Sequence, residues 1–288
     1  MNRLVTLAGA VLLLSVVLGC GSTPSEPTKI VTESGSVPSC YAISGLDIAP
    51  PVQARDVFVL VDQTTMIDSK IRETLTTNLK RLIQNGTGFT IATFSARDRD
   101  GYAKIVARGL VERTVTGPKQ KSLPKRRLDK LDACLSQQTE FAGILAAQAM
   151  AKATSADAAA FTHSEILASL AVLSQAVKAS PADDKIVLVV SDLFEHSTST
   201  SFYAAQRLRR LDVGAELQKA ADQSLIGDFG NARIYVVGAG LPPPDGPPDS
   251  LRDQEALNSL RQFWENWFRE SHGDLREYGQ PDLVNPII

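Results

Sequence analysis

Two aspartates each stand directly after a run of apolar, mostly β-branched residues. Asp62 follows VFVLV and Asp192 follows KIVLVVS. Two threonines accompany them, because Thr64 lies two residues beyond Asp62 and Thr162 precedes a segment with helical periodicity. Carboxylate and hydroxyl oxygens are the ligands that hard divalent cations such as Mg²⁺ prefer. These four residues therefore form a candidate cation site.

Helix capping is the alternative interpretation of the same residues, since Asp and Thr are common at helix N-termini. Asp62 and Thr64 precede a predicted helix over 67–84, and Thr162 precedes another over 164–179. Capping explains each residue separately. It does not explain why two buried strands both end in aspartate.

The segments around these residues alternate between strand and helix patterns. Apolar runs predict strands at 56–61, 88–95, 104–112, 185–191 and 232–238. Helical periodicity predicts helices at 67–84, 127–135, 138–153, 164–179, 202–225 and 249–271. This alternation predicts an α/β fold with a doubly wound, mainly parallel sheet and helices on both faces. The short link between 88–95 and 104–112 predicts a hairpin, and hence one antiparallel edge strand.

In open α/β sheets, ligands bind at the carboxyl ends of the strands. Both aspartates are predicted to lie at such ends, so the sequence places them on the same edge of the sheet. In chain order, the motif Asp-Gln-Thr-Thr-Met at 62–66, then Thr162, then Ser191-Asp192 resembles a von Willebrand factor type A (vWA) domain with its metal-ion-dependent adhesion site. In that family a strand ends in Asp-x-Ser-x-Ser, a threonine follows at a later helix start, and an aspartate follows a later strand.

The resemblance covers about residues 54–272. It implies a vWA/Rossmann-like fold and a Mg²⁺ ion, or Mn²⁺ or Ca²⁺ in its place. It also implies that a partner's carboxylate completes the coordination of the ion. The ligands that it implies in this chain are Asp62, Thr64, Thr162 and Asp192.

Two positions depart from the family pattern. Met66 stands where the second serine is expected, and its thioether is a poor Mg²⁺ ligand. Leu193 stands where a glycine usually follows the aspartate. Thr65 offers a neighbouring hydroxyl, but its side chain is expected to point away from the ion. The sequence therefore leaves open whether a metal is bound.

These observations favour a non-enzymatic binding or scaffold module that recognises a protein of the cell envelope at this edge. One alternative is a Mg²⁺-dependent phosphoryl-transfer hydrolase, because a strand-end aspartate that begins an Asp-x-Thr sequence, here Asp62-Gln63-Thr64, resembles phosphatase sites, including haloacid-dehalogenase-like ones. Those sites need a second aspartate where this chain has Thr64. Another alternative is a structural lipoprotein with a vestigial site.

The first residues predict export and lipid anchoring. Residues 1–19 have a basic start and a short apolar stretch, as in a bacterial lipoprotein signal peptide, and Cys20 is the expected lipidated (palmitate-bearing) residue. Residues 20–50 are predicted to form a tether and N-terminal arm, and 51–288 a single domain. Gly21 after the cysteine favours the outer membrane, facing the periplasm.

The remaining cysteines, Cys40 and Cys134, form an even pair in the oxidising compartment that export implies. We expect a disulfide that ties the arm to the body of the domain. Two unpaired thiols are the alternative, because spacing alone does not decide between them.

Charge gives no support for a nucleic-acid partner, since the formal net charge is −2 and basic residues are scattered. Only Lys119–Arg127 is locally basic, and the nearby Pro118 and Pro124 predict a solvated loop there. A contact of this segment with anionic lipid or glycan stays open.

An aromatic stripe marks the last predicted helix. We expect this stripe to pack onto the sheet, although a partly exposed Trp267 would instead suit a protein partner. Its residues are Leu260, Phe263, Trp264, Trp267 and Phe268.

Overall fold

The computed structural model describes residues 30–32, 36–98, 101–155, 163–204, 207–242 and 253–288. Two predicted functional residues, Cys20 and Thr162, lie outside these ranges. Within them, none of the helices combines the length and the apolar composition that crossing a membrane requires.

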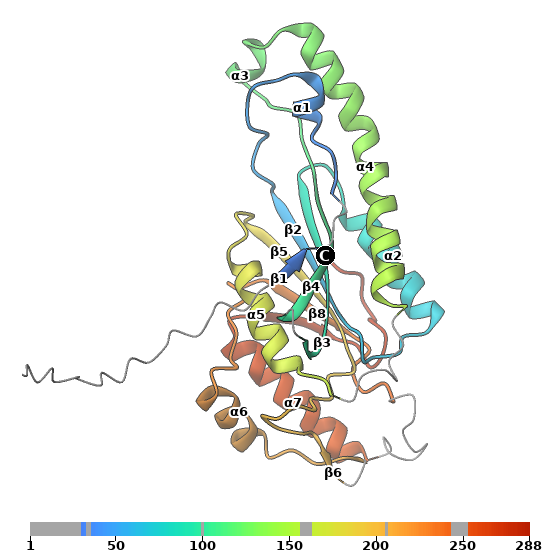
Figure 1. The fold of residues 1–288 in the computed structure, drawn as a ribbon, viewed down its shortest axis with the longest axis vertical. Coiled ribbons are helices and arrows are strands. Elements are labelled where there is room, and N and C mark those ends of the chain that lie inside the picture. The colour runs from blue at the N-terminus through green and yellow to red at the C-terminus, as the bar shows by residue number, and fades with distance from the viewer. Residues whose placement is uncertain (1–29, 33–35, 99–100, 156–162, 205–206, 243–252) are drawn as a thin grey trace, which may run out of the picture.

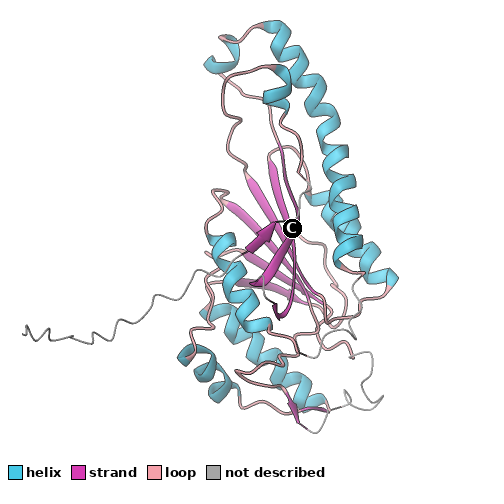
Figure 2. Ribbon diagram, in the orientation of Figure 1, coloured by secondary structure: helices cyan, strands magenta, loops and turns pink. Residues whose placement is uncertain are grey.

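A seven-stranded sheet in the order β1-β4-β3-β2-β5-β8-β9 forms the centre of the molecule (Figures 1 and 2). Its strands are β1 (Ile30–Thr32), β2 (Arg55–Asp62), β3 (Thr87–Asp98), β4 (Gly101–Val111), β5 (Asp184–Val190), β8 (Arg233–Val237) and β9 (Asp274–Tyr278). The pairs β2–β3, β2–β5, β5–β8 and β8–β9 are parallel, whereas β3 and β4 form an antiparallel hairpin. The predicted mainly parallel, vWA-like α/β fold is confirmed.

The sequence pattern did not predict either of the two outermost strands, β1 and β9. β4 is not the edge strand, because the three-residue β1 pairs with it in parallel. At the other edge, β9 has the sequence DLREY, in which three of five residues are charged. Charged residues commonly protect edge strands, and they hide the apolar pattern by which strands are recognised.

The helices cover both faces of the sheet, as predicted. They are α1 (Cys40–Ser44), α2 (Ser69–Leu82), α3 (Pro118–Lys121), α4 (Lys125–Ala153), α5 (Ile166–Lys178), α6 (Val213–Asp222) and α7 (Gln254–Glu270). Alternate residues of β2 point to opposite faces. Phe58 and Leu60 join the apolar core under α5 and α7, whereas Val57 and Val59 join the core under α2 and α4. Because both faces are buried, β2 is a continuous apolar run.

Two regions differ from the prediction. The separate helices expected at 127–135 and 138–153 are one helix, α4, which also contains the last three residues of the basic segment expected to be a loop, while α3 contains its first three. Within 202–225, a two-stranded hairpin of β6 (Tyr203–Ala204) and β7 (Arg207–Leu208) precedes α6. Both differences arise because packing against distant elements overrides weak local preferences.

The aromatic stripe of α7 packs inward. Trp264 and Trp267 are both 0% exposed, and their indole N–H groups donate to the carbonyls of Leu193 at 2.9 Å and Leu225 at 3.0 Å. The alternative of an exposed Trp267 for a protein partner is therefore wrong. This stripe instead fixes the loops that follow β5 and α6.

The elongated molecule has a narrow end formed by α1, α3 and the first half of α4 (Figure 1). Cys40 and Cys134 form the predicted disulfide there, with their Cα atoms 5.6 Å apart. Buried Glu112 caps α1, because its Oε2 accepts from the backbone N of Cys40 at 2.7 Å. The three apolar clusters of the described residues contain no residue before Val37. A chain that begins after Cys20 therefore retains every packed element described.

Candidate functional site

Asp62 lies at the carboxyl end of β2 and is 1% exposed. One carboxylate oxygen, Oδ1, accepts from the backbone N of Thr64 at 2.9 Å and from its Oγ1 at 2.6 Å. The other, Oδ2, accepts from Ser191 Oγ at 2.8 Å and from Ser164 Oγ at 3.4 Å. Three loops therefore meet at this carboxylate.

Asp192 follows β5 on the same edge and is 5% exposed. Its Oδ1 accepts from the backbone N of Phe194 at 2.9 Å, and its own backbone N donates to Thr65 Oγ1 at 2.9 Å. Among the described residues, no side chain donates to the Asp192 carboxylate. The predicted convergence of Asp62 and Asp192 at one sheet edge is thus observed.

Burial raises the pKa of both carboxyl groups, and the charge of Asp62 adds to this effect at Asp192. Burial raises the pKa of Asp62, although hydrogen bonds from Thr64, Ser191 and Ser164 oppose the change. Burial and the negative charge of Asp62 together raise the pKa of Asp192 well above its usual range. Within the described part of the chain, no basic side chain compensates Asp192. Two close buried carboxylates without a counter-charge are costly for the fold.

The capping alternative fails for Asp62 and Thr64. Helix α2 is capped by Asp68 instead, whose Oδ1 accepts from the backbone N of Ile71 at 2.8 Å. Asp62 is six residues before the cap and receives hydrogen bonds rather than serving the helix. Its burial at the strand end therefore needs another explanation.

Ser164 contacts Asp62, and it lies two residues after the predicted ligand Thr162, which is outside the described residues. Its Oγ lies 3.4 Å from Asp62 Oδ2 and 3.2 Å from Thr64 Oγ1. Paired backbone hydrogen bonds of 2.9 Å with His196 hold its position. The signal in the sequence was the Thr-His-Ser segment at 162–164, which contains two hydroxyl residues, and of these the described residues include Ser164.

Glu195 is a site residue that the sequence did not reveal. Its Oε2 accepts from the backbone N of Leu167 at 2.9 Å, so it caps α5, whose own cap residue Glu165 makes no side-chain capping bond. Burial raises the pKa of Glu195 to about 8, despite hydrogen bonds from Ser197 and the start of α5. Glu195 thereby joins the loop after β5 to the helix that follows Ser164.

Leu193 has a left-handed backbone with φ of 65°, at the position where the vWA pattern has glycine. A left-handed conformation costs a leucine roughly 1–2 kcal/mol. The side chain is fully buried in the α7 core, and its carbonyl accepts from Trp264. Core packing therefore holds the turn that a glycine would adopt without strain.

The side chain of Met66 is 57% exposed. Thr65 does point toward the Asp192 loop, but its hydroxyl oxygen accepts the amide of Asp192. The described residues contain no group of three or more His, Cys, Asp or Glu side chains arranged around a common metal position. Any ion at this edge would thus be held by two carboxylates and by hydroxyls.

The rim of the site is aromatic. The rings of His163 and His196 stack with centroids 5.1 Å apart, and Tyr203 contacts His196 edge-on at 5.7 Å. Burial and the neighbouring His163 lower the pKa of His196, whereas burial and the charges of Asp192 and Asp62 raise that of Tyr203. Tyr203 therefore stays a neutral phenol beside the carboxylates.

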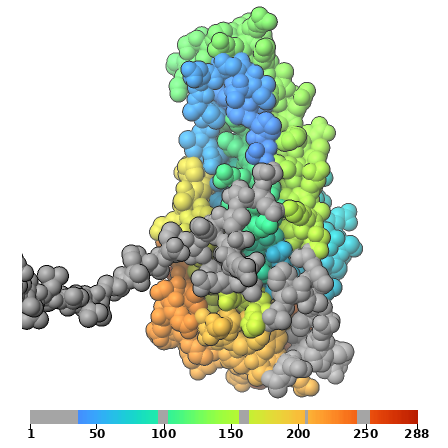
Figure 3. Space-filling model, in the orientation of Figure 1, coloured from blue at the N-terminus to red at the C-terminus, as the bar shows by residue number. Residues whose placement is uncertain are grey.

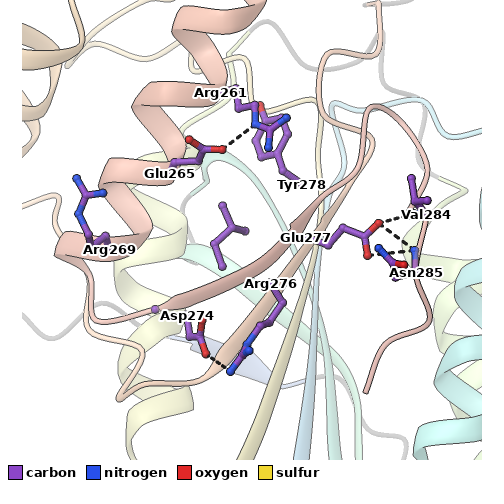
Figure 4. A pocket seen from close by; sticks show the side chains of 11 residues that line it. Arg261, Glu265, Arg269, Asp274, Arg276, Glu277, Tyr278, Val284 and Asn285 are labelled. Carbon is purple, nitrogen blue, oxygen red and sulfur yellow. Dashed lines mark hydrogen bonds and ion pairs between the residues drawn. The ribbon is translucent and has the colours of Figure 1, made fainter.

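A separate groove of about 650 Å³ lies between α7 and the edge strand β9 (Figure 4). Four of its charged residues form two ion pairs, Arg261 with Glu265 and Arg276 with Asp274, and Arg269 bonds the side chain of Asn266. Glu277 accepts from the backbone of Val284 and Asn285. Because these groups are internally satisfied, the groove does not compete with the carboxylate edge as the candidate site.

Comparisons with known proteins leave the family unassigned. No family model matches the sequence, and no curated protein is significantly similar. An aerotolerance-related membrane protein from Bacteroides fragilis superposes with 13% identity and a TM-score of 0.34 over 78% of this chain and 92% of that one. BatB from Bacteroides thetaiotaomicron superposes with 14% identity and a TM-score of 0.36 over 78% of this chain and 90% of that one. At these TM-scores the superpositions add nothing to the observed strand order.

Proposed function

We propose that this chain is a lipid-anchored binding module of the cell envelope that recognises a protein partner at the carboxyl edge of its sheet, with a divalent cation bound there. The observation that carries the proposal is the pair of buried carboxylates, Asp62 and Asp192, without a basic counter-charge in the described residues. A cation is the usual compensation for such a pair.

The donor set fits a hard cation such as Mg²⁺, or Mn²⁺ or Ca²⁺. Thr64 and Ser164 each donate their hydroxyl proton toward Asp62, which leaves oxygen lone pairs for a metal. Asp192 has a carboxylate oxygen, Oδ2, with no hydrogen-bond donor among the described residues. Asp62, Thr64, Ser164 and Asp192 would hold the ion, and Thr162 remains a proposed ligand outside the described residues.

When bound, the ion would neutralise the two carboxylates and offer a coordination position to an oxygen ligand of the partner. The exposed Met66 supplies no hydroxyl at the position where the vWA pattern has its second serine. We therefore expect weaker ion binding than a complete set of ligands would give.

Several residues of the chain position the proposed ligands. Ser191 holds Asp62 by a 2.8 Å hydrogen bond, and Thr65 holds the backbone of Asp192. Glu195 fixes the start of α5 close to Ser164. These contacts keep three loops in place before a ligand arrives, which lowers the entropy cost of binding.

The rest of the proposal rests on the sequence. The signal-like residues 1–19 and Cys20 support a lipid anchor, in the outer membrane on the periplasmic side. A non-enzymatic role is favoured over phosphoryl transfer because Thr64 replaces the second aspartate that phosphatase-like sites use. A phosphatase assay of the purified chain is expected to show no turnover.

Thermal unfolding in a Mg²⁺ titration tests the cation site. The wild-type chain is expected to gain stability with Mg²⁺, by about 2.7 kcal/mol at one hundred times the dissociation constant. The Asp192→Asn variant should melt higher than wild type without Mg²⁺, since a buried charge is removed, and should not respond to Mg²⁺. The exposed control, Asp47→Asn, should respond like wild type. An unchanged Mg²⁺ response in Asp192→Asn would exclude the site.

A further inference from the structure

A basic surface covers the narrow end of the molecule, on α3 and the first turns of α4. We call it the basic tip, and it consists of the exposed residues Lys119, Lys121, Lys125, Arg126, Arg127 and Lys130. Figures 1 and 3 show this end, with α1 beside it, at the top of the view.

The basic tip concentrates positive charge in an otherwise acidic chain. Residues 119–132 contain six basic and two acidic side chains, a net charge of +4. The whole chain has a net charge of −2, which leaves −6 for all other residues. Charge is therefore strongly segregated along the molecule.

Local stability does not explain this placement. Lys125, Arg126 and Arg127 occupy the first turn of α4, which has no acidic residue, although the helix dipole disfavours positive charge there. Arg127 donates to the carbonyl of Gly45 at 2.7 Å. The other five basic side chains make no ion pair with any described residue. These cations are thus available to an external anion.

The backbone under the basic tip is rigidly held. The Cys40–Cys134 disulfide joins α1 to α4, and Gln138 links the two regions by bonding both Glu112 and Pro38. On α1, Ile43 is 61% exposed. The same end of the molecule therefore presents cations together with an apolar side chain, a combination typical of proteins that lie on a membrane surface.

We propose that the basic tip docks onto an anionic lipid surface, where its lysines and arginines contact headgroup phosphates and Ile43 enters the headgroup region. A nucleic acid is less suited to it, because single-strand binding relies on aromatic stacking and residues 113–135 contain no Phe, Trp or Tyr. Each basic residue near an anionic surface strengthens binding by about fivefold.

Docking would also orient the molecule. The basic tip lies beyond the amino ends of the parallel strands, since β4 leads into it and Val111 pairs with Thr87, which pairs with Arg55 at the start of β2. Asp62 lies at the opposite end of β2. The carboxylate edge would then face away from the membrane.

Vesicle co-sedimentation of residues 21–288, which contain every packed element described, tests the proposal without the lipid anchor. The fragment should bind phosphatidylglycerol-containing vesicles at least about tenfold more tightly than pure phosphatidylcholine vesicles, and high salt should abolish the difference. The variant Lys119→Glu/Lys121→Glu/Lys125→Glu should lose this preference. A charge-matched control, Lys70→Glu/Lys80→Glu/Arg207→Glu, changes exposed residues elsewhere and should keep most of it.

Equal binding of wild type to both vesicle types would overturn the proposal, whatever the variants do. So would equal losses in the tip variant and in its control, because net charge alone would then explain the binding. Binding to heparin or single-stranded DNA without binding to anionic vesicles would assign the surface to another polyanion. The variant Ile43→Ser loses an apolar contact with the headgroup region. It should therefore bind anionic vesicles more weakly than wild type, with the same dependence on salt concentration.

Discussion

The backbone amide of Asp192 donates to Thr65 Oγ1 at 2.9 Å, which joins loops that are 127 residues apart in the chain. The bond fixes the loop after β5 against the loop after β2, so that the carboxylates of Asp62 and Asp192 stay close despite their mutual repulsion. Thr65 thus has a structural role in the edge rather than the role of a ligand.

Replacing Thr65 by valine tests this role. Valine has the same shape but no hydroxyl, so the amide of Asp192 loses its acceptor, and we expect a loss of about 1–3 kcal/mol in the free energy of unfolding. Urea denaturation measures the change. Thr65→Ser keeps the hydroxyl and should stay near wild type, and a valine variant as stable as the serine variant would refute the role.

A substitution at Met66 tests whether Mg²⁺ affinity can be increased. The variant Met66→Ser restores the hydroxyl of the vWA pattern and should increase Mg²⁺ affinity about tenfold, as about 1.4 kcal/mol of added binding energy would. Titration calorimetry compares it with wild type. Met66→Leu, which keeps an apolar side chain, is the control, and equal affinities of the two variants would show that position 66 does not face the ion.

Glu195 predicts a pH dependence of stability. Burial raises its pKa from 4.5 to about 8, so the neutral carboxyl gives its full stabilisation below about pH 4.5. This contribution is lost progressively as the pH rises to about 8, and a shift of this size corresponds to roughly 5 kcal/mol. Melting temperatures in metal-free buffer should therefore fall over this range.

The Glu195→Gln variant isolates this effect. Its amide oxygen still accepts from Leu167, but it cannot ionise, so the fall between pH 4.5 and 8 should be much smaller than in wild type. Asp62 and Asp192 have pKa values raised in the same direction and leave a residual slope. Identical pH profiles of variant and wild type would rule out Glu195 as the titrating group.

Removing the Cys40–Cys134 disulfide is expected to lower the stability of the protein without changing Mg²⁺ binding at the carboxylate edge. The disulfide closes a loop of 94 residues, and the double variant Cys40→Ser/Cys134→Ser should lose about 2–4 kcal/mol in stability. The carboxylate edge is at the other end of the molecule, so stabilisation by Mg²⁺ should be unchanged. A loss of the Mg²⁺ response in this variant would show that the two ends are coupled.

The sequence by itself determined the α/β class, the doubly buried strands β2 and β5, and the two aspartates at their carboxyl ends. These features are encoded locally, because a run such as VFVLV has the composition of a strand buried on both faces and the chain must leave the sheet where the run ends. The hairpin of β3 and β4 was also predictable locally, because the link between the two strands is too short for a crossover connection.

Only the tertiary structure decided which side chains meet Asp62 and Asp192. Ser164 is 102 residues from Asp62, and Thr65 is 127 residues from Asp192, so strand register and loop packing bring each pair together. Packing likewise places Glu195 against the start of α5. The same holds for Leu193, whose left-handed backbone is stabilised by the α7 core. Local patterns specify periodicity and chain breaks, whereas neighbours across a sheet edge depend on how separate elements pack.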